Sequence, residues 1–181
     1  MESIPITDLV QIKKSSLERE DENLRFRVWM KGHDYGDDAW RAEAEKIQSA
    51  IDCRQCANCC RVMKTSLHDG DLERLAEALQ ITPDEVLEQY TEKGDSDLSF
   101  LKMTGSGCVF LDGNDCKIYE NRPTECRGFP YLVGTEGTLA ERTFAILQNA
   151  ELCPIVYNSL ERWKEMSNWS RFPPRRRRRR W

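Results

Sequence analysis

Apolar residues recur at helical spacing in several stretches of the chain. One face of residues 39–51 carries Trp40, Ala44, Ile47 and Ile51, which predicts a helix that Asp37 or Asp38 can cap. The same periodicity predicts helices over 71–79 and 154–166, and a charged, exposed helix over 16–31. Thr82-Pro83 followed by Glu85 forms a capping box, so we expect another helix over 83–91.

The period shortens between residues 98 and 119. Short apolar runs over 98–103, 108–111 and 116–119 predict strands. Asp112-Gly113-Asn114-Asp115 predicts a hairpin turn between the last two, because Gly and Asn accept positive φ. Residues 138–149 are ambiguous. These patterns indicate an α+β fold that is mostly helical. We expect a small irregular domain with a short β-hairpin, organised around one or more cysteine–metal sites.

The chain of 181 residues is long enough to bury a core without disulfides. We expect an N-terminal arm and exposed helix over 1–37, with residues up to 16 loose, a cysteine-cluster metal-binding domain over 38–168, and a basic disordered tail over 169–181. No run approaches the ~18 apolar residues of a membrane span. The first residues lack the basic start and apolar stretch of a secretory signal, so we expect a cytoplasmic protein without a membrane contact.

Charge is distributed unevenly along the chain. Seven of the 27 basic residues lie among the last eleven positions, so the rest of the chain carries −11 where the whole carries −4. An acidic body repels nucleic acid. Only the run Arg175–Arg180 is therefore expected to bind nucleic acid or an acidic partner; a solubilising tail, or one held by the acidic body, is the alternative.

The cysteines are the second unusual feature, because a reducing cytosol disfavours disulfides. The C-x2-C spacing lets a tight turn aim two thiolates at one ion, and thiolates without an obvious histidine favour zinc or an iron–sulfur cluster. Their number permits two four-thiolate sites, or one site with spare cysteines. The candidate metal ligands are Cys53, Cys56, Cys59, Cys60, Cys108, Cys116, Cys126 and Cys153.

Local geometry adds expectations about these ligands. The side chains of Cys59 and Cys60 are adjacent and are expected to point apart, so that one serves a second metal or stays a core or reactive thiol. Asn58 is expected to take the left-handed turn between the cysteine pairs. Cys108 and Cys116 begin the two predicted strands, so a third strand or the loop to Cys126 must close the site.

Several neighbours of the cysteines are candidates for a supporting role. His68 is a candidate ligand or proton shuttle, with a helix-start residue as the alternative. Basic side chains near the cysteines can offset the negative charge of a thiolate site, or can be ordinary surface charges. They are Arg54, Arg61, Lys64, Lys117, Arg122 and Arg127.

Cys53 to Cys60, the block GCVFLDGNDCKIYENRPTECRGFPY and Cys153-Pro154 resemble the YkgJ-type cysteine-cluster family, the CxxCxxCC zinc- or iron-chelating domains. The resemblance covers residues 50–165 and implies metal chelation through the matching cysteines. It implies no particular reaction, although some members carry an iron–sulfur oxidoreductase label. Ala57 stands where the family usually has Gly.

Three functional hypotheses are open at this point. In the first, the chain is a metal-binding protein that holds zinc or an iron–sulfur cluster, and it is redox-active if it holds the cluster. If the protein is an enzyme, we expect an iron–sulfur oxidoreductase, and its redox partner is not identified. Alternatively, it is a zinc-stabilised interaction module that uses the arginine tail. The third hypothesis is a metalloenzyme with a reactive thiol such as Cys60 beside the metal. Buried reduced thiols and a thioredoxin-type pair are the competing interpretations of the cysteines.

Overall fold

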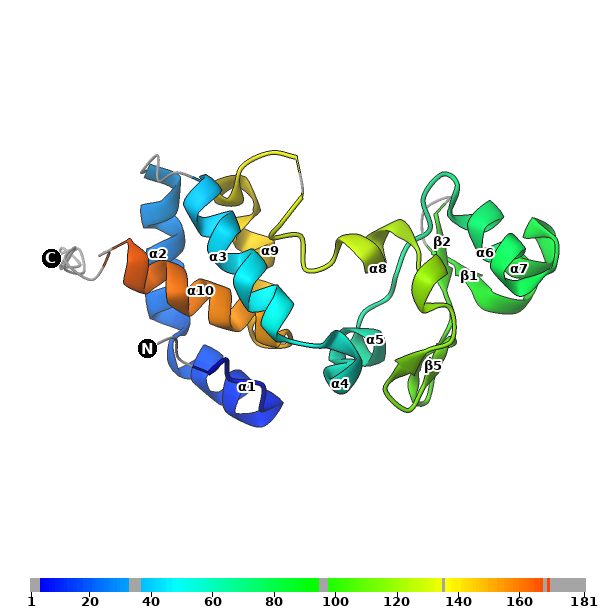
Figure 1. Ribbon diagram of the computed structural model, residues 1–181, viewed down its shortest axis with the longest axis horizontal. Helices are drawn as coiled ribbons and strands as arrows, with labels where there is room; N and C mark the ends of the chain where they lie inside the picture. The colour runs from blue at the N-terminus through cyan, green and yellow to red at the C-terminus, as the bar shows by residue number, and fades with distance from the viewer. Residues whose placement is uncertain (1–3, 33–36, 95–97, 135, 168, 170–181) are drawn as a thin grey trace, which may run out of the picture. The chain divides into compact units, whose positions relative to one another are not determined.

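The computed structural model describes residues 4–32, 37–94, 98–134, 136–167 and 169 (Figure 1). The chain divides into two compact units, one formed by residues 1–51 with 132–181 and the other by residues 52–131. We call them the helical unit and the cysteine unit, since Cys153 lies in the first and the other seven cysteines lie in the second. Across these described ranges, no helix has the length and apolar character that a bilayer span requires.

The predicted fold class is confirmed, because helices dominate and the strands form short antiparallel pairs. The division into an arm over 1–37, a domain over 38–168 and a tail over 169–181 stays a prediction. The tail lies outside the described residues except for Trp169.

The helical unit is built on α10, which packs against α3, α9 and α1, while α2 packs against α9 (Figure 1). Stacked indoles join α10 to α3: the Trp40 and Trp163 rings lie 5.7 Å apart, and Trp163 Nε1 donates to the Trp40 carbonyl at 3.0 Å. The helices are α1 (Leu9–Glu18), α2 (Glu20–Gly32), α3 (Asp37–Ala50), α9 (Leu139–Ala150) and α10 (Pro154–Met166).

Capping explains where these helices begin. The predicted helices α3 and α10 are confirmed. The expectation of a loose arm up to residue 16 was wrong, because Asp8 caps α1 by accepting from the Gln11 amide at 2.8 Å. The ambiguous stretch after residue 138 is helical, since Thr138 and Glu141 form a complete capping box.

The cysteine unit packs short elements around a small apolar core. The buried core residues are Leu67, Leu75, Ala76, Val86, Leu101, Phe110 and Ile118. The helices are α4 (Cys53–Cys56), α5 (Asn58–Val62), α6 (Asp71–Leu79), α7 (Pro83–Tyr90), the 3-10 helix η1 (Tyr119–Asn121) and α8 (Thr124–Gly128). The antiparallel pairs are β1 (Thr91–Lys93) with β2 (Ser99–Leu101), β3 (Met103–Thr104) with β4 (Gly107–Cys108), and β5 (Leu111–Asp112) with β6 (Asp115–Cys116).

The predicted turn at Gly113 is confirmed, with φ 62°, but the predicted strand extents were wrong. Strands β5 and β6 flank the turn directly, and residues 103–108 form a separate hairpin. Thr104 closes that hairpin, because its hydroxyl accepts from the Ser106 amide and donates to the Gly107 carbonyl. Cys108 and Cys116 therefore end two successive hairpins, and each pairs within its own hairpin rather than with the other.

Gly107 allows two cysteine-bearing segments to approach backbone to backbone. Its φ is +127°, and a Cβ there would lie 2.8 Å from the Cys60 carbonyl oxygen and 2.9 Å from Arg61 Cα. A side chain at this position would therefore push β4 away from α5.

We predict that Gly107→Ala destabilises the protein by about 2 kcal/mol or more, because it adds backbone strain and a backbone clash. Gly105→Ala is the matched control, since a Cβ at Gly105 meets nothing within 4 Å. Urea unfolding of both variants tests this. Equal stability of the two would contradict the close approach of α5 and β4.

Asp71 ties the start of α6 to α8. Its fully buried carboxylate accepts from the His68 amide at 2.9 Å and from the amide and hydroxyl of Thr124 at 3.0 and 2.8 Å, and it pairs with Arg74. Burial opposes ionisation, but these hydrogen bonds and the Arg74 charge outweigh it and lower the pKa of Asp71.

We predict that Asp71→Asn costs about 3 kcal/mol at neutral pH, since it leaves buried partners unpaired. A lowered folded-state pKa stabilises the protein above the unfolded pKa of about 3.9, and that stability is lost as pH falls through the folded value. The difference in unfolding free energy between wild type and variant should therefore shrink below about pH 4. Asp69→Asn, at an exposed neighbour, is the control. A constant difference across pH would refute the assignment.

Candidate metal centre

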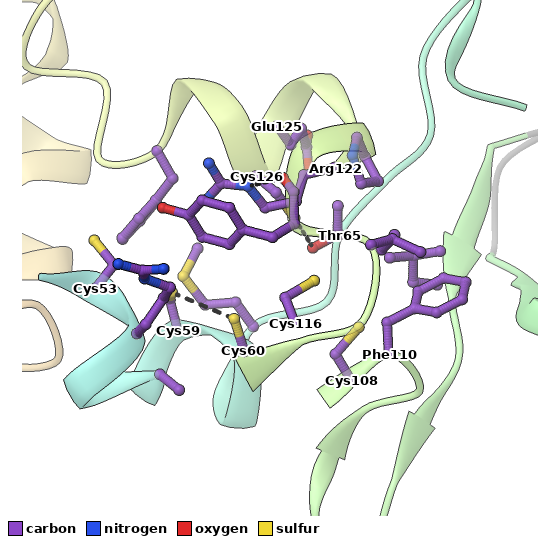
Figure 2. Close-up of a pocket in the computed structure, with 18 of the residues that line it drawn as sticks. Cys53, Cys59, Cys60, Thr65, Cys108, Phe110, Cys116, Arg122, Glu125 and Cys126 are labelled. Carbon is purple, nitrogen blue, oxygen red and sulfur yellow. Dashed lines mark hydrogen bonds between the residues drawn. The ribbon is translucent and has the colours of Figure 1, made fainter. Parts of the chain in front are cut away.

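A pocket with a volume of about 340 Å³ lies within the cysteine unit (Figure 2). Its thiol-bearing lining residues are Cys53, Cys59, Cys60, Cys108, Cys116 and Cys126. In Figure 2 the side chains of Cys60, Cys108 and Cys116 come from the lower side of the pocket, and Cys126 comes from the helix above it. Cys56 is half-buried and Cys153 is buried in the helical unit; neither is among the lining residues.

The first cysteine segment folds as two short helices separated by one left-handed residue. Asp52 caps α4 by accepting from the Arg54 amide at 3.0 Å, and the Ala57 amide closes the helix on the Cys53 carbonyl. Ala57 takes the left-handed conformation, with φ 49°, and Asn58 begins α5. The expectation that Asn58 makes the turn was wrong because the reversal comes one residue earlier.

Cys59 and Cys60 have sulfur atoms 4.0 Å apart. The expectation that their side chains point apart was wrong, because both belong to α5. Successive side chains of a helix diverge by only about 100°, whereas those of a strand point to opposite faces. Both thiols therefore line one pocket.

Cys108 and Cys116 occupy equivalent positions at the ends of their hairpins. Each sulfur accepts the backbone N–H of the residue two positions later, Phe110 or Ile118. Both donor residues are buried in the core, which fixes their amides. Burial raises the pKa of both thiols, although the amide hydrogen bonds partly offset this effect. A nearby cation would therefore be needed to stabilise these two sulfurs as thiolates.

Cys126 lies on α8 with its sulfur 3.4 Å from the Thr65 hydroxyl. Burial raises the pKa of Cys126 to about 11, and the Thr65 hydrogen bond opposes it. Next to it, the Glu125 carboxylate accepts from the Ser66 amide at 2.9 Å and from the Ser66 hydroxyl at 2.5 Å. The chain after the first cysteine segment is thereby bound to α8.

Four thiols from separate segments lie within electrostatic reach of one another. A negative charge on Cys60 raises the pKa of Cys108, Cys116 and Cys126. A charge on Cys116 also raises the pKa of Cys108, and charges on Cys108 and Cys116 raise the pKa of Cys126. We call these residues the four-thiol set. They surround the pocket rather than meet at a point: among the residues that the structure describes, no three Cys, His, Asp or Glu side chains converge as closely as the ligands of a single ion.

Cys60 is the member most ready to ionise. A hydrogen bond from Cys59 and the charges of Arg122 and Arg61 outweigh burial and lower the pKa of Cys60 to about 6. Thiolate is the form that binds metal, so Cys60 is available as a ligand at neutral pH.

Arg61 clamps the first cysteine segment to the β5–β6 hairpin. Its guanidinium donates to the Cys56 carbonyl and to the Gly113 carbonyl, each at 2.8 Å, and to the Asn114 side chain. Asn114 Nδ2 donates in return to the Gln55 carbonyl at 3.0 Å. We call this network the Arg61 clamp; it fixes Cys60 relative to Cys116.

The other basic candidates differ in their surroundings. Three form surface ion pairs with a carboxylate: Arg54 with Asp52, Lys64 with Glu92, and Lys117 with Asp112. Arg127 is exposed, and Arg122 lines the pocket, as do Arg54 and Lys64. His68 contacts Glu125 at 3.3 Å and is not among the residues that line the pocket.

Sequence reasoning missed Thr65 and Glu125, which support Cys126, and the apolar wall of the pocket. The signal for Glu125 was its place directly before Cys126; Thr65 carried no local signal, because it lies 61 residues from its partner. Apolar lining residues exclude water and strengthen electrostatic interactions inside. They are Met63, Leu101, Phe110, Ile118, Phe129 and Tyr131.

Comparison with known proteins agrees with the cysteine pattern. Residues 52–154 match the family model described as "CxxCxxCC: Putative zinc- or iron-chelating domain". An uncharacterised protein of Methanocaldococcus jannaschii is 38% identical over 86 residues, which cover 46% of this chain and 46% of that protein. The chain thus spans about half the length of this curated relative. No solved structure matches the chain.

The arginine run Arg175–Arg180 lies outside the described residues. Its binding to nucleic acid or to an acidic partner stays a prediction.

We predict that Arg61→Gln destabilises the protein by about 2 kcal/mol, because charge-assisted hydrogen bonds to two segments are lost. Arg61→Lys should recover less than half of this loss, since an ammonium group cannot serve the same acceptors in fork geometry. Arg54→Gln, which breaks an exposed pair with Asp52, should cost at most about 1 kcal/mol. Urea unfolding of the three variants measures this, and full recovery by lysine would argue against the clamp.

Proposed function

Because the chain belongs to the CxxCxxCC family of zinc- or iron-chelating domains, we propose that its cysteine unit holds an iron–sulfur cluster in the thiol pocket and serves in electron transfer. The observation that carries this proposal is the four-thiol set, in which sulfurs from α5, β4, β6 and α8 line one cavity. Thiolate donors suit zinc and iron–sulfur clusters and suit magnesium or calcium poorly.

The size of the pocket favours a cluster over a single ion. Thiolates bonded to one zinc ion lie about 2.3 Å from it and close around a point. The described Cys, His, Asp and Glu side chains are too far apart for three of them to meet at one ion, and inorganic sulfide between iron atoms can span the separation around a cavity of about 340 Å³. The same separation makes zinc the weaker candidate.

The residues of the pocket fit a negatively charged centre. Cys60, Cys108, Cys116 and Cys126 are the proposed ligands. The amides of Phe110 and Ile118 donate to two of these sulfurs, and hydrogen bonds to sulfur are one of the means by which proteins set a cluster potential. Cys59 donates to Cys60 in this proposal and is not itself a ligand. When bound, the cluster supplies one-electron chemistry; this chain's residues hold its charge and exclude water.

Four cysteines lie outside the four-thiol set: Cys59, whose sulfur is 4.0 Å from that of Cys60, and three others that have different environments. Cys53 is exposed, Cys56 is half-buried, and Cys153 is buried in the helical unit. Ligation by these residues is the alternative that the variants below separate. The reduced thiols that assembly requires suit a reducing compartment, so we propose a cytoplasmic location.

We predict that protein purified without oxygen contains iron and acid-labile sulfide and shows a visible charge-transfer absorption. Serine substitution of Cys108, Cys116 or Cys126 should abolish most of the absorption, because oxygen replaces a ligand sulfur. Cys53→Ser and Cys153→Ala should retain it. Iron, zinc and sulfide analysis together with absorption spectra provide the measurement.

Two outcomes would contradict the proposal. Stoichiometric zinc without iron in the wild-type protein would replace the cluster by a zinc site. Loss of iron in Cys53→Ser, with retention in Cys126→Ser, would show that the wrong thiols were assigned. Circular dichroism of each variant separates loss of the cluster from loss of the fold.

A further inference from the structure

Arg122 is a cation held inside the thiol pocket. Its guanidinium lies 3.7 Å from the centre of the Tyr119 ring, and its Nε donates to the Tyr119 carbonyl at 2.8 Å. Among the described residues, Arg122 makes no ion pair with a carboxylate. Arg54 and Lys64 also line the pocket but pair with Asp52 and Glu92, so Arg122 is the basic lining residue without a carboxylate partner in the described part of the chain.

The backbone and the ring together fix the position of this charge. Arg122 follows η1 and precedes Pro123, and its φ of −54° and ψ of 145° are the extended conformation that a following proline favours. Pro123 is the N-cap residue of α8, which carries Cys126. With the backbone held and one side of the guanidinium covered by Tyr119, the side chain loses little additional entropy in facing the pocket.

The charge of Arg122 lies in the same pocket as thiols from the first cysteine segment and from β6. Arg122 lines the pocket together with Cys53, Cys60 and Cys116. Lys117 is closer in sequence to Cys116, but it lies at the surface beside Asp112, where solvent and the carboxylate screen its charge. Arg122 thus lies in the pocket of the proposed centre, whereas Lys117 is not among the residues that line it.

We propose that Arg122 sets the reduction potential of the centre by stabilising the extra negative charge of its reduced state. The inference rests on the proposed function, because it needs a redox-active centre in the pocket. Four thiolates around an iron–sulfur core leave a net negative charge, and reduction adds one electron. A fixed cation stabilises the more negative state more strongly, so it raises the potential.

The step itself is a simple electron transfer. In the titration that measures it, dithionite is oxidised and the cluster gains one electron; no bond to the protein forms or breaks. Arginine stays protonated at all accessible pH values, so its charge acts equally before and after the transfer.

The experiment compares Arg122→Gln, Arg122→Lys and the control Lys117→Gln in anaerobically purified protein. A dithionite titration followed by visible absorption gives the midpoint potential, and iron analysis gives the occupancy. We expect Arg122→Gln to lower the equilibrium constant for reduction at least tenfold, about 59 mV for a one-electron couple. Arg122→Lys should retain most of the wild-type value, and Lys117→Gln should equal wild type.

The other possible results for the Arg122 variants distinguish between failure of this inference and failure of the proposed function. An unchanged potential in Arg122→Gln would overturn the inference while the iron–sulfur proposal stands, whereas a wild-type protein without iron would overturn the proposed function. If the cluster fails to assemble in Arg122→Gln but assembles in Arg122→Lys, the charge is needed and the inference is supported. If both variants lose iron, Arg122 acts through packing, and its electrostatic role is wrong.

Discussion

Burial of several thiols around one pocket, which opposes their ionisation, is the constraint on which the cysteine unit depends. Four sulfurs face one apolar pocket, and burial together with their neighbours' charges raises the pKa of Cys108, Cys116 and Cys126. Such a group is stable as thiolate only with a compensating cation. Two amide hydrogen bonds and the charge of Arg122 supply part of that compensation, and the proposed metal centre would complete it.

The fold brings these thiols together through contacts between backbones rather than through a large core. A glycine lets β4 reach α5, a buried aspartate binds α6 to α8, and an arginine joins α4 and α5 to the β5–β6 hairpin. The strands are two or three residues long, so their own hydrogen bonds contribute little. Hydrogen bonds from side chains to the backbone therefore connect the segments of this unit, as the hydrogen bonds of a sheet do in a larger domain.

Local patterns predicted the regular elements well and the contacts between segments poorly. The helices α3, α6, α7 and α10 and the turn at Gly113 followed from periodicity, capping residues and turn chemistry. Which thiols share a pocket could not be deduced, because Thr65 to Cys126 and Arg61 to Gly113 are contacts across 61 and 52 residues. The orientation of Cys59 and Cys60 depended on the helical state of a five-residue segment, which propensity does not determine.

An anomalous difference map at the iron absorption edge, from crystals grown without oxygen, tests most simply whether the thiol pocket holds an iron–sulfur cluster. We expect strong iron peaks inside the pocket, bonded to the sulfurs of Cys60, Cys108, Cys116 and Cys126. A single peak at the zinc edge alone, or iron bound outside this pocket, would contradict this expectation.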